Sequence, residues 1–271
     1  MVSEMQPAGL SPGLTSHLSG GGELDYFAYI PERATPSSPV LVSVHGLERQ
    51  ALQHAVRFSP LAERFGFIVV APLFTKSRMS RYQRAQPARE AAEAPLDAFD
   101  LTVDHFRRAH DLQTSAIDLF GYSGGAQFAM RYVLAGSILV RRLVLAAPGW
   151  FTMPSDAYPY PYGVGAIGAK APRPLQLERL LTTPTLLVVG SEDTRREASL
   201  NREPLIDEMQ GRNRLERARR WSEAMAVAAK ARGLTGQVEL RILPEAGHDF
   251  DDNMRTHALG QHVFDWISGQ G

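Results

Sequence analysis

A serine in a glycine-rich turn is the residue of this chain best suited to nucleophilic chemistry. The pattern G-x-S-x-G is matched at 121–125 (GYSGG), after the apolar run 117–120 and before the helical segment 126–134. A serine on so tight a strand-to-helix turn is held in strained backbone, and its neighbours must be small because a side chain there would collide with adjacent elements. We therefore predict Ser123 as a nucleophile; the alternative is an ordinary glycine-rich turn.

A serine nucleophile needs an imidazole that accepts its proton and an acid that fixes the imidazole tautomer. Of the eight histidines, His248 lies in a turn-rich segment directly after the predicted strand 238–243. Asp193 follows the preceding strand, 185–189, in the sequence GSED. The resulting chain order is serine, aspartate, histidine, which differs from the order in trypsin-like and subtilisin-like enzymes.

Other carboxylates compete with Asp193 for the role of the acid. Glu192 is adjacent, and Asp193 would then be a turn-forming residue. We favour Asp193 because an aspartate in the pattern G-x-x-D suits the triad geometry. Asp249, Asp251 and Asp252 lie close to His248 in sequence and are interpreted as solvated loop charges.

The negative oxygen of a tetrahedral intermediate needs preorganised donors, usually two backbone N–H groups. Gly124 directly follows the predicted nucleophile at the start of a helix, where the helix dipole favours an anion. The second donor is expected in the loop after the strand 40–44, and we predict the N–H of Leu47. His45 in the same loop is interpreted as a residue that hydrogen-bonds within the loop and not as a second base.

The elements that must position these residues alternate between strand and helix. Short apolar runs, typical of strands buried on both faces, are separated by segments of helical periodicity. The predicted strands are 24–30, 40–44, 67–71, 117–120, 143–147, 185–189 and 238–243, and the predicted helices are 51–65, 96–110, 124–134, 212–232 and 254–267. This alternation predicts an α/β fold with a mostly parallel, doubly wound sheet, helices on both faces and ligand binding beyond the carboxyl ends of the strands.

The bulk composition narrows the class further. The 271 residues include 29 Lys and Arg, 29 Asp and Glu, and no Cys, so general attraction to nucleic acid or an anionic membrane, disulfides and thiolate metal sites are not expected. The chain shows neither a signal-peptide pattern nor a membrane-spanning run, which predicts a cytoplasmic location. We expect one domain over 1–271, with a short Pro/Tyr-rich cap or loop excursion at 149–181, no metal or organic cofactor, and a small, roughly neutral partner.

Taken together, these motifs resemble the α/β-hydrolase superfamily from Leu24 to Ile267. The segment Leu61–Pro72 (LAERFGFIVVAP) is similar to esterases related to polyhydroxybutyrate depolymerases, feruloyl esterases and dienelactone hydrolases. The resemblance implies an acyl-enzyme mechanism without a cofactor, with Ser123, His248 and Asp193 as nucleophile, base and acid. Dienelactone hydrolases have Cys where this chain has Ser123, and haloalkane dehalogenases have Asp there, so neither reaction is expected.

Two groups of residues could shape the substrate side. Trp150, Tyr158, Tyr160 and Tyr162 follow a strand end and are interpreted either as the wall of an acyl or aromatic pocket or as packing of a proline-stiffened loop. A basic cluster on the predicted helix 212–232 is interpreted as a solvated face, and Arg195 and Arg196 lie just after Asp193. If some of these arginines reach the pocket, a substrate that bears a carboxylate is favoured instead. The cluster consists of Arg212, Arg214, Arg217, Arg219 and Arg220.

The sequence therefore predicts a serine hydrolase that cleaves carboxylic esters through an acyl-enzyme. An amidase or peptidase, a thioesterase or an acyltransferase could use the same three residues, and the sequence does not separate these. A non-catalytic binding protein on the same fold is the alternative from a different class. Acyl and alcohol preference, cap movement and oligomeric state stay open.

Overall fold

The fold is built on a twisted sheet, seen in a computed structural model that describes residues 10–88, 93–166 and 171–270. The sheet contains eight strands in the order β1-β2-β4-β3-β5-β6-β7-β8. Only β2 runs against the others, because it pairs antiparallel with both β1 and β4 while the remaining pairings are parallel. The strands are β1 (Gly13–His17), β2 (Asp25–Ile30), β3 (Val40–Val44), β4 (Ile68–Leu73), β5 (Ala116–Tyr122), β6 (Leu139–Ala146), β7 (Thr185–Gly190) and β8 (Val238–Leu243).

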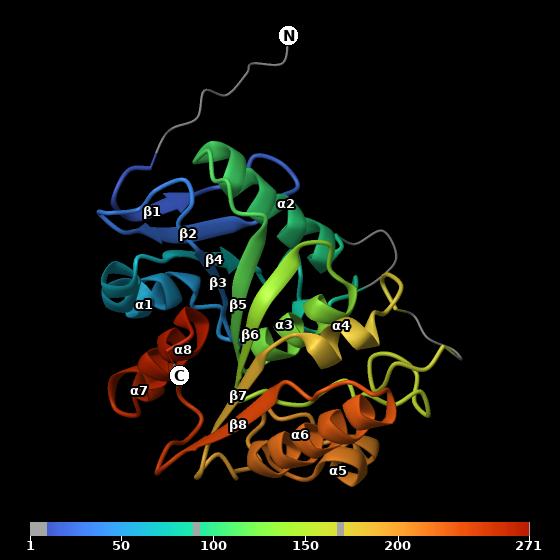
Figure 1. Ribbon diagram of the computed structural model, residues 1–271. Coiled ribbons are helices and arrows are strands. Elements are labelled where there is room, and N and C mark those ends of the chain that lie inside the picture. Colours follow the sequence, from blue (N-terminus) through green and yellow to red (C-terminus); the bar gives the residue numbers. More distant parts are fainter. Residues whose placement is uncertain (1–9, 89–92, 167–170, 271) are drawn as a thin grey trace.

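Helices cover both faces of this sheet. The helices are α1 (Ala51–Phe65), α2 (Pro95–Ala109), α3 (Gly124–Ala135), α4 (Leu177–Thr182), α5 (Pro204–Gln210), α6 (Arg214–Ala231), α7 (Phe250–Arg255) and α8 (Leu259–Ser268), with a 3₁₀ turn at Tyr82–Arg84. One apolar cluster joins α1 and α8 to the sheet, and a second joins α2, α3, α4 and α6 to the other face. Figure 1 shows α1, α7 and α8 on one side and α2, α3 and α4 on the other.

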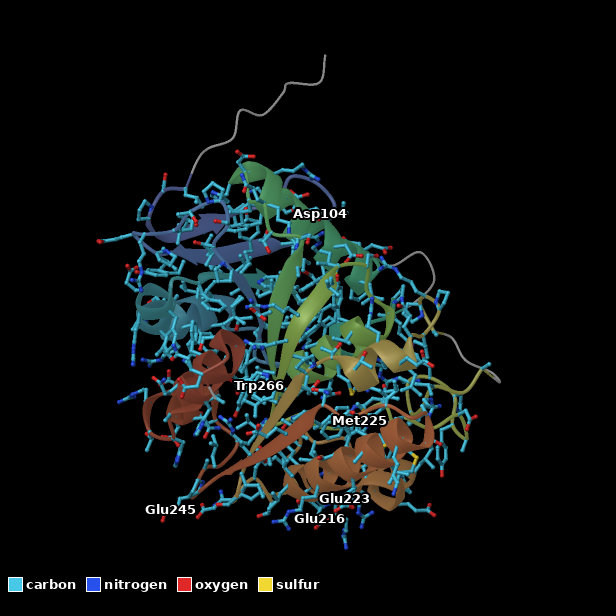
Figure 2. The ribbon with its side chains drawn as sticks, viewed as in Figure 1. Asp104, Glu216, Glu223, Met225, Glu245 and Trp266 are labelled. Atoms are coloured by element: carbon cyan, nitrogen blue, oxygen red, sulfur yellow. The ribbon has the colours of Figure 1, made fainter. Side chains whose placement is uncertain are left out.

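The central strands are buried because their sequences are apolar at successive positions. Every residue of β3 (VLVSV) and of β7 (TLLVVG) is buried, as expected for parallel strands covered on both faces. Helix α6 instead has one buried stripe: Met225 faces the sheet, while Glu216 and Glu223 project from the outer side (Figure 2). The predicted α/β architecture, with its mostly parallel sheet and helices on both faces, is confirmed.

Several elements differ from the prediction. The edge strand β1 was not expected, because GLTSH offers no buried apolar face and is held by its ladder with β2. The single helix expected at 254–267 is two helices, separated at Ala258, which has a left-handed φ of 53°. Two short helices were not predicted: α4, near the end of the expected cap or loop excursion at 149–181, and α5, which precedes α6. Among the described residues, no helix has the length and apolar character needed to cross a bilayer.

Candidate active site

Ser123 lies on the sharp turn between β5 and α3. Its φ of 53° and ψ of −109° are strained for a residue with a side chain. The flanking glycines are required by close backbone contacts: a Cβ on Gly121 would lie 2.3 Å from the carbonyl oxygen of Gly125, and a Cβ on Gly125 would lie 2.1 Å from that of Val44. The turn therefore has the strand, strain and glycine spacing predicted for a nucleophilic serine.

The two other predicted residues meet Ser123 at the carboxyl edge of the sheet. His248, on the loop after β8, has its Nε2 3.0 Å from the Oγ of Ser123. Its Nδ1 is 2.8 Å from Oδ2 of Asp193, on the loop after β7. The Nδ1–H therefore donates to the carboxylate, and Nε2 is free to accept the serine proton. Ser123 is 9% exposed and the side chain of His248 is 12% exposed, so the hydroxyl and imidazole reach solvent while the carboxylate is buried.

The loop that carries His248 is held from both sides. The rings of Tyr122 and His248 stack with centroids 5.4 Å apart. Asn253 donates from Nδ2 to the carbonyl of Gly247 and to the hydroxyl of Tyr122, both at 3.1 Å. Burial raises the pKa of Tyr122, so its hydroxyl stays protonated at neutral pH. These contacts fix the imidazole plane, which a proton relay needs.

The competing acids lie elsewhere. Glu192 is exposed, and its backbone N–H donates to the carbonyl of Ala246. Asp249 caps the N-terminus of α7 by accepting from the N–H of Asp252, which is itself exposed. Asp251 departs from the solvated role expected for it, because it is only partly exposed and forms an ion pair with Arg57 at 2.5 Å that lowers the pKa of its carboxyl. Asp193 is thus the carboxylate that the structure brings to His248.

Part of the basic cluster on α6 is buried, which corrects the prediction of a solvated face. Arg212, Arg219 and Arg220 are exposed, whereas Arg214 and Arg217 are at most 1% exposed. Arg214 donates from Nη1 to Oδ1 of Asp193 at 3.1 Å. Sequence reasoning missed this contact, although the spacing of Arg214 from the apolar positions Ala218 and Trp221 carried a signal, because residues four and seven apart share a helix face.

The loop after β3 lies against the nucleophile, as the expected oxyanion site requires. A Cβ on Gly46 would be 3.5 Å from the Cβ of Ser123, and one on Gly124 would be 3.0 Å from the side chain of Leu47. Gly124 is the first residue of α3, so its N–H has no partner within the helix. In the described residues the N–H of Leu47 likewise donates to no protein acceptor.

His45 holds the loop after β3 in place through two hydrogen bonds of its ring. Its Nδ1–H donates to the carbonyl of Gly46 at 2.7 Å, and its Nε2 accepts from the N–H of Phe74 at 3.0 Å. Acceptance at Nε2 requires the neutral ring, because a protonated imidazole has no free lone pair. Burial lowers the pKa of His45 to about 4, which keeps the ring neutral. The residue therefore hydrogen-bonds within the loop, as interpreted from the sequence, and also ties that loop to the end of β4.

A cavity of ≈ 120 Å³ opens beside Ser123 and His248. Three acidic residues, Glu48, Glu197 and Asp249, stand among its lining, and no Lys or Arg is found there among the described residues. The remaining lining residues are Gly46, Leu47, Gln50, His54, Tyr122, Ser199 and Phe250. His54 stacks on Phe250 with ring centroids 3.9 Å apart, which gives the cavity a rigid aromatic side.

The aromatic set predicted as a pocket wall does not line this cavity. Tyr160 is buried and its hydroxyl donates to the carbonyl of Arg84, while the hydroxyl of Tyr162 donates to Glu203 at 2.7 Å. Trp150 is buried beneath the guanidinium of Arg131, 4.2 Å from its ring centroid. Tyr158 is partly exposed. These contacts fit the alternative interpretation, in which the aromatic side chains pack a proline-stiffened loop against the protein and do not line the cavity.

The described residues hold no group of three or more His, Cys, Asp or Glu that could bind a metal ion. The groups that meet at the site are the serine hydroxyl, the imidazole, the carboxylate and the N–H groups of Leu47 and Gly124. Such a set can transfer an acyl group through a covalent serine intermediate.

Solved structures of other proteins share this fold, although the sequence comparisons found no match. No protein-family model matches the chain, and no curated protein matches it. Among solved structures it is similar to a poly(aspartic acid) hydrolase from Sphingomonas sp. KT-1, with 25% identity, a TM-score of 0.81 and coverage of 94% of this chain and 100% of that chain. A poly(3-hydroxybutyrate) depolymerase from Bordetella parapertussis is 27% identical, with a TM-score of 0.78 and coverage of 96% and 91%.

An S-formylglutathione hydrolase from Agrobacterium tumefaciens shares the fold at 16% identity, a TM-score of 0.61 and 94% coverage of both chains. The chain thus has the α/β-hydrolase fold. Within that superfamily it resembles serine hydrolases, and the resemblance to polyhydroxybutyrate depolymerases expected from its motifs is confirmed.

Proposed function

We propose that this chain is a serine hydrolase that cleaves carboxylic esters, with Ser123, His248 and Asp193 as nucleophile, base and acid. The observation that carries the proposal is the continuous relay of two hydrogen bonds, 3.0 Å from serine to imidazole and 2.8 Å from imidazole to carboxylate. A relay with these lengths lets the imidazole take the serine proton as the serine oxygen attacks a carbonyl carbon.

The reaction then follows from the positions of the groups. The N–H groups of Leu47 and Gly124 stabilise the oxygen that becomes negative, and His248 returns its proton to the departing alcohol. Water, deprotonated by His248, then attacks the acyl-serine carbonyl; the acid is released as His248 returns that proton to the oxygen of Ser123. The cavity of ≈ 120 Å³ has room for about four water molecules, which favours a short acyl or alcohol group next to the scissile bond.

Labelling by a fluorophosphonate probe, followed by a panel of p-nitrophenyl esters of increasing chain length, tests the proposal. Wild type and the control Ser191→Ala should be labelled and turn over short esters, whereas Ser123→Ala should do neither. Labelling that survives Ser123→Ala, or an unlabelled and inactive wild type, would refute the assignment.

Hydrolysis of amide bonds is a second candidate. It is favoured by the similarity to the poly(aspartic acid) hydrolase, whose named substrate is joined by amide bonds. The acidic residues of the cavity wall oppose a polyanion as the substrate of this chain, because like charges repel. Matched ester and amide substrates with the same acyl group decide between the two bonds.

A further inference from the structure

The carboxylate of Asp193 has two hydrogen-bond partners, one for each oxygen. Oδ2 accepts from His248, and Oδ1 accepts from Nη1 of Arg214 at 3.1 Å. The side chains of Asp193 and Arg214 are each 1% exposed, so water does not screen their interaction. A second guanidinium nitrogen, Nη2, donates at 3.1 Å to Ser199, which lines the cavity beside the nucleophile.

The place of Arg214 in its helix is unfavourable without this carboxylate. Arg214 is the first residue of α6, where the helix dipole disfavours a positive charge. Its Nε also has no hydrogen-bond partner among the described residues, although it is buried. A buried ion pair of this kind stabilises a fold weakly, because desolvation of both charges offsets their attraction. Stability alone is therefore a poor reason for an arginine at this position.

We propose that Arg214 is a positioning residue of the hydrolase: by holding Oδ1 of Asp193 it fixes the plane of the carboxylate towards His248 and places a positive charge beside the Asp193–His248 pair. This inference rests on the proposed function of the site. A carboxylate buried beside the imidazole alone would be free to rotate or to take up a proton. With Oδ1 held by a guanidinium, Oδ2 is directed at Nδ1 of His248.

The charges that face this pair decide the sign of the expected pH effect. Arg214 from α6 is positive, whereas Asp249, next to His248, and Glu197 and Glu48 from the cavity wall are negative. The hydroxyl of Tyr122, which stacks on the imidazole, is neutral. Removal of the positive charge of Arg214 should raise the proton affinity of the pair, whichever of the two side chains holds the proton.

Steady-state kinetics of Arg214→Met and Arg214→Lys as a function of pH test the proposal. In Arg214→Met we expect kcat to fall by about 100-fold, through misplacement of the base, and the acid limb of kcat/KM to move up by on the order of one pH unit. KM should change little, since Arg214 does not line the cavity. Arg214→Lys keeps the charge but loses the second donor, so it should restore the position of the acid limb and part of kcat.

Arg217→Met is the matched control. Arg217 is also fully buried on α6, but it donates to Asp207 and to carbonyl oxygens, not to Asp193. It should lower stability without moving the acid limb. The proposal is overturned if Arg214→Met keeps the wild-type kcat and pH profile, or if Arg217→Met reproduces its shift.

A double variant and an NMR titration test the role of Arg214 independently of the single-variant kinetics. In the Asp193→Ala background, Arg214→Met should cause no further loss of kcat, because the carboxylate that it orients is already gone. An NMR titration of the His248 ring in wild type and Arg214→Lys or Arg214→Met needs no substrate. It tests Arg214 even if no ester is cleaved, while an unlabelled Ser123 would refute the hydrolase function alone. Equal titration midpoints in wild type and Arg214→Met would refute the role of Arg214.

Discussion

Acidification should loosen the loop proposed to hold the oxyanion, through protonation of His45. Nε2 of this buried ring accepts from the N–H of Phe74, and a protonated ring cannot accept. The folded protein therefore resists protonation, and burial lowers the pKa of His45 from 6.5 to about 4. The unfolded chain binds this proton as the pH falls through 6.5, so the stabilisation is fully present above 6.5 and is lost between 6.5 and about 4.

The size of the effect follows from that difference. Between pH 7.5 and pH 5, a group with pKa 6.5 unfolded and about 4 folded removes about 2 kcal/mol from the free energy of unfolding. Burial also lowers the pKa of His54, which lies at the same edge and adds to the loss in the same direction. The contribution of His45 must therefore be isolated by difference.

Urea unfolding of wild type and His45→Gln at intervals from pH 7.5 to pH 5 isolates this contribution. The variant lacks the titrating ring but retains His54, so the contribution of His54 largely cancels in the difference. His45→Gln should be the less stable protein at pH 7.5, and the difference should narrow by about 2 kcal/mol at pH 5. A difference that stays constant over this range would refute the argument that His45 is held neutral.

Two further predictions concern the turn and the cavity. Gly125→Ala places a Cβ 2.1 Å from the carbonyl oxygen of Val44. It should therefore lower the free energy of unfolding in urea by about 3 kcal/mol and abolish fluorophosphonate labelling. The control Gly247→Ala has open space at its Cβ and should unfold like wild type. Because the cavity is acidic, kcat/KM should be higher for the neutral ester p-nitrophenyl butyrate than for the anionic ester p-nitrophenyl hemisuccinate. In the double variant Glu48→Gln/Glu197→Gln, the ratio of these two kcat/KM values should fall by about fivefold. A wild type that prefers the anionic ester would contradict the charge argument.

The parts of this structure that sequence could predict are those set by short, local patterns. The boundaries of α1 and β3 match the predicted ranges, because a helical period and a continuous apolar run mark them without help from the rest of the chain. Ser123 was also predictable, since the steric need for Gly121 and Gly125 is a property of the turn itself. His248 and Asp193 followed from the rule that parallel strands end at a common edge.

The parts that could not be predicted depend on contacts between distant segments. The side-chain directions of Trp150 and Tyr160 are set by Arg131 and by the carbonyl of Arg84, which no spacing within 149–181 encodes. The edge strand β1 exists because β2 offers a free ladder. The solvated role expected of Arg214 was wrong because its partner, Asp193, lies 21 residues earlier, on the loop after β7, and no local pattern reveals that contact.

The buried polar groups at the carboxyl edge explain how strained loops can hold a reactive geometry. His45 joins the loop after β3 to Phe74, Asn253 joins the loop after β8 to Tyr122, and Arg214 joins the loop after β7 to α6. Each contact joins a loop to another segment, and each buries polar atoms that cost free energy if left unpaired. A loop that moved would leave its partner unsatisfied, so these contacts penalise motion in addition to stabilising one position. The relay from Ser123 to Asp193 is in this sense rigid because its supports are polar, and apolar packing of equal area would hold the same loops with less directional precision.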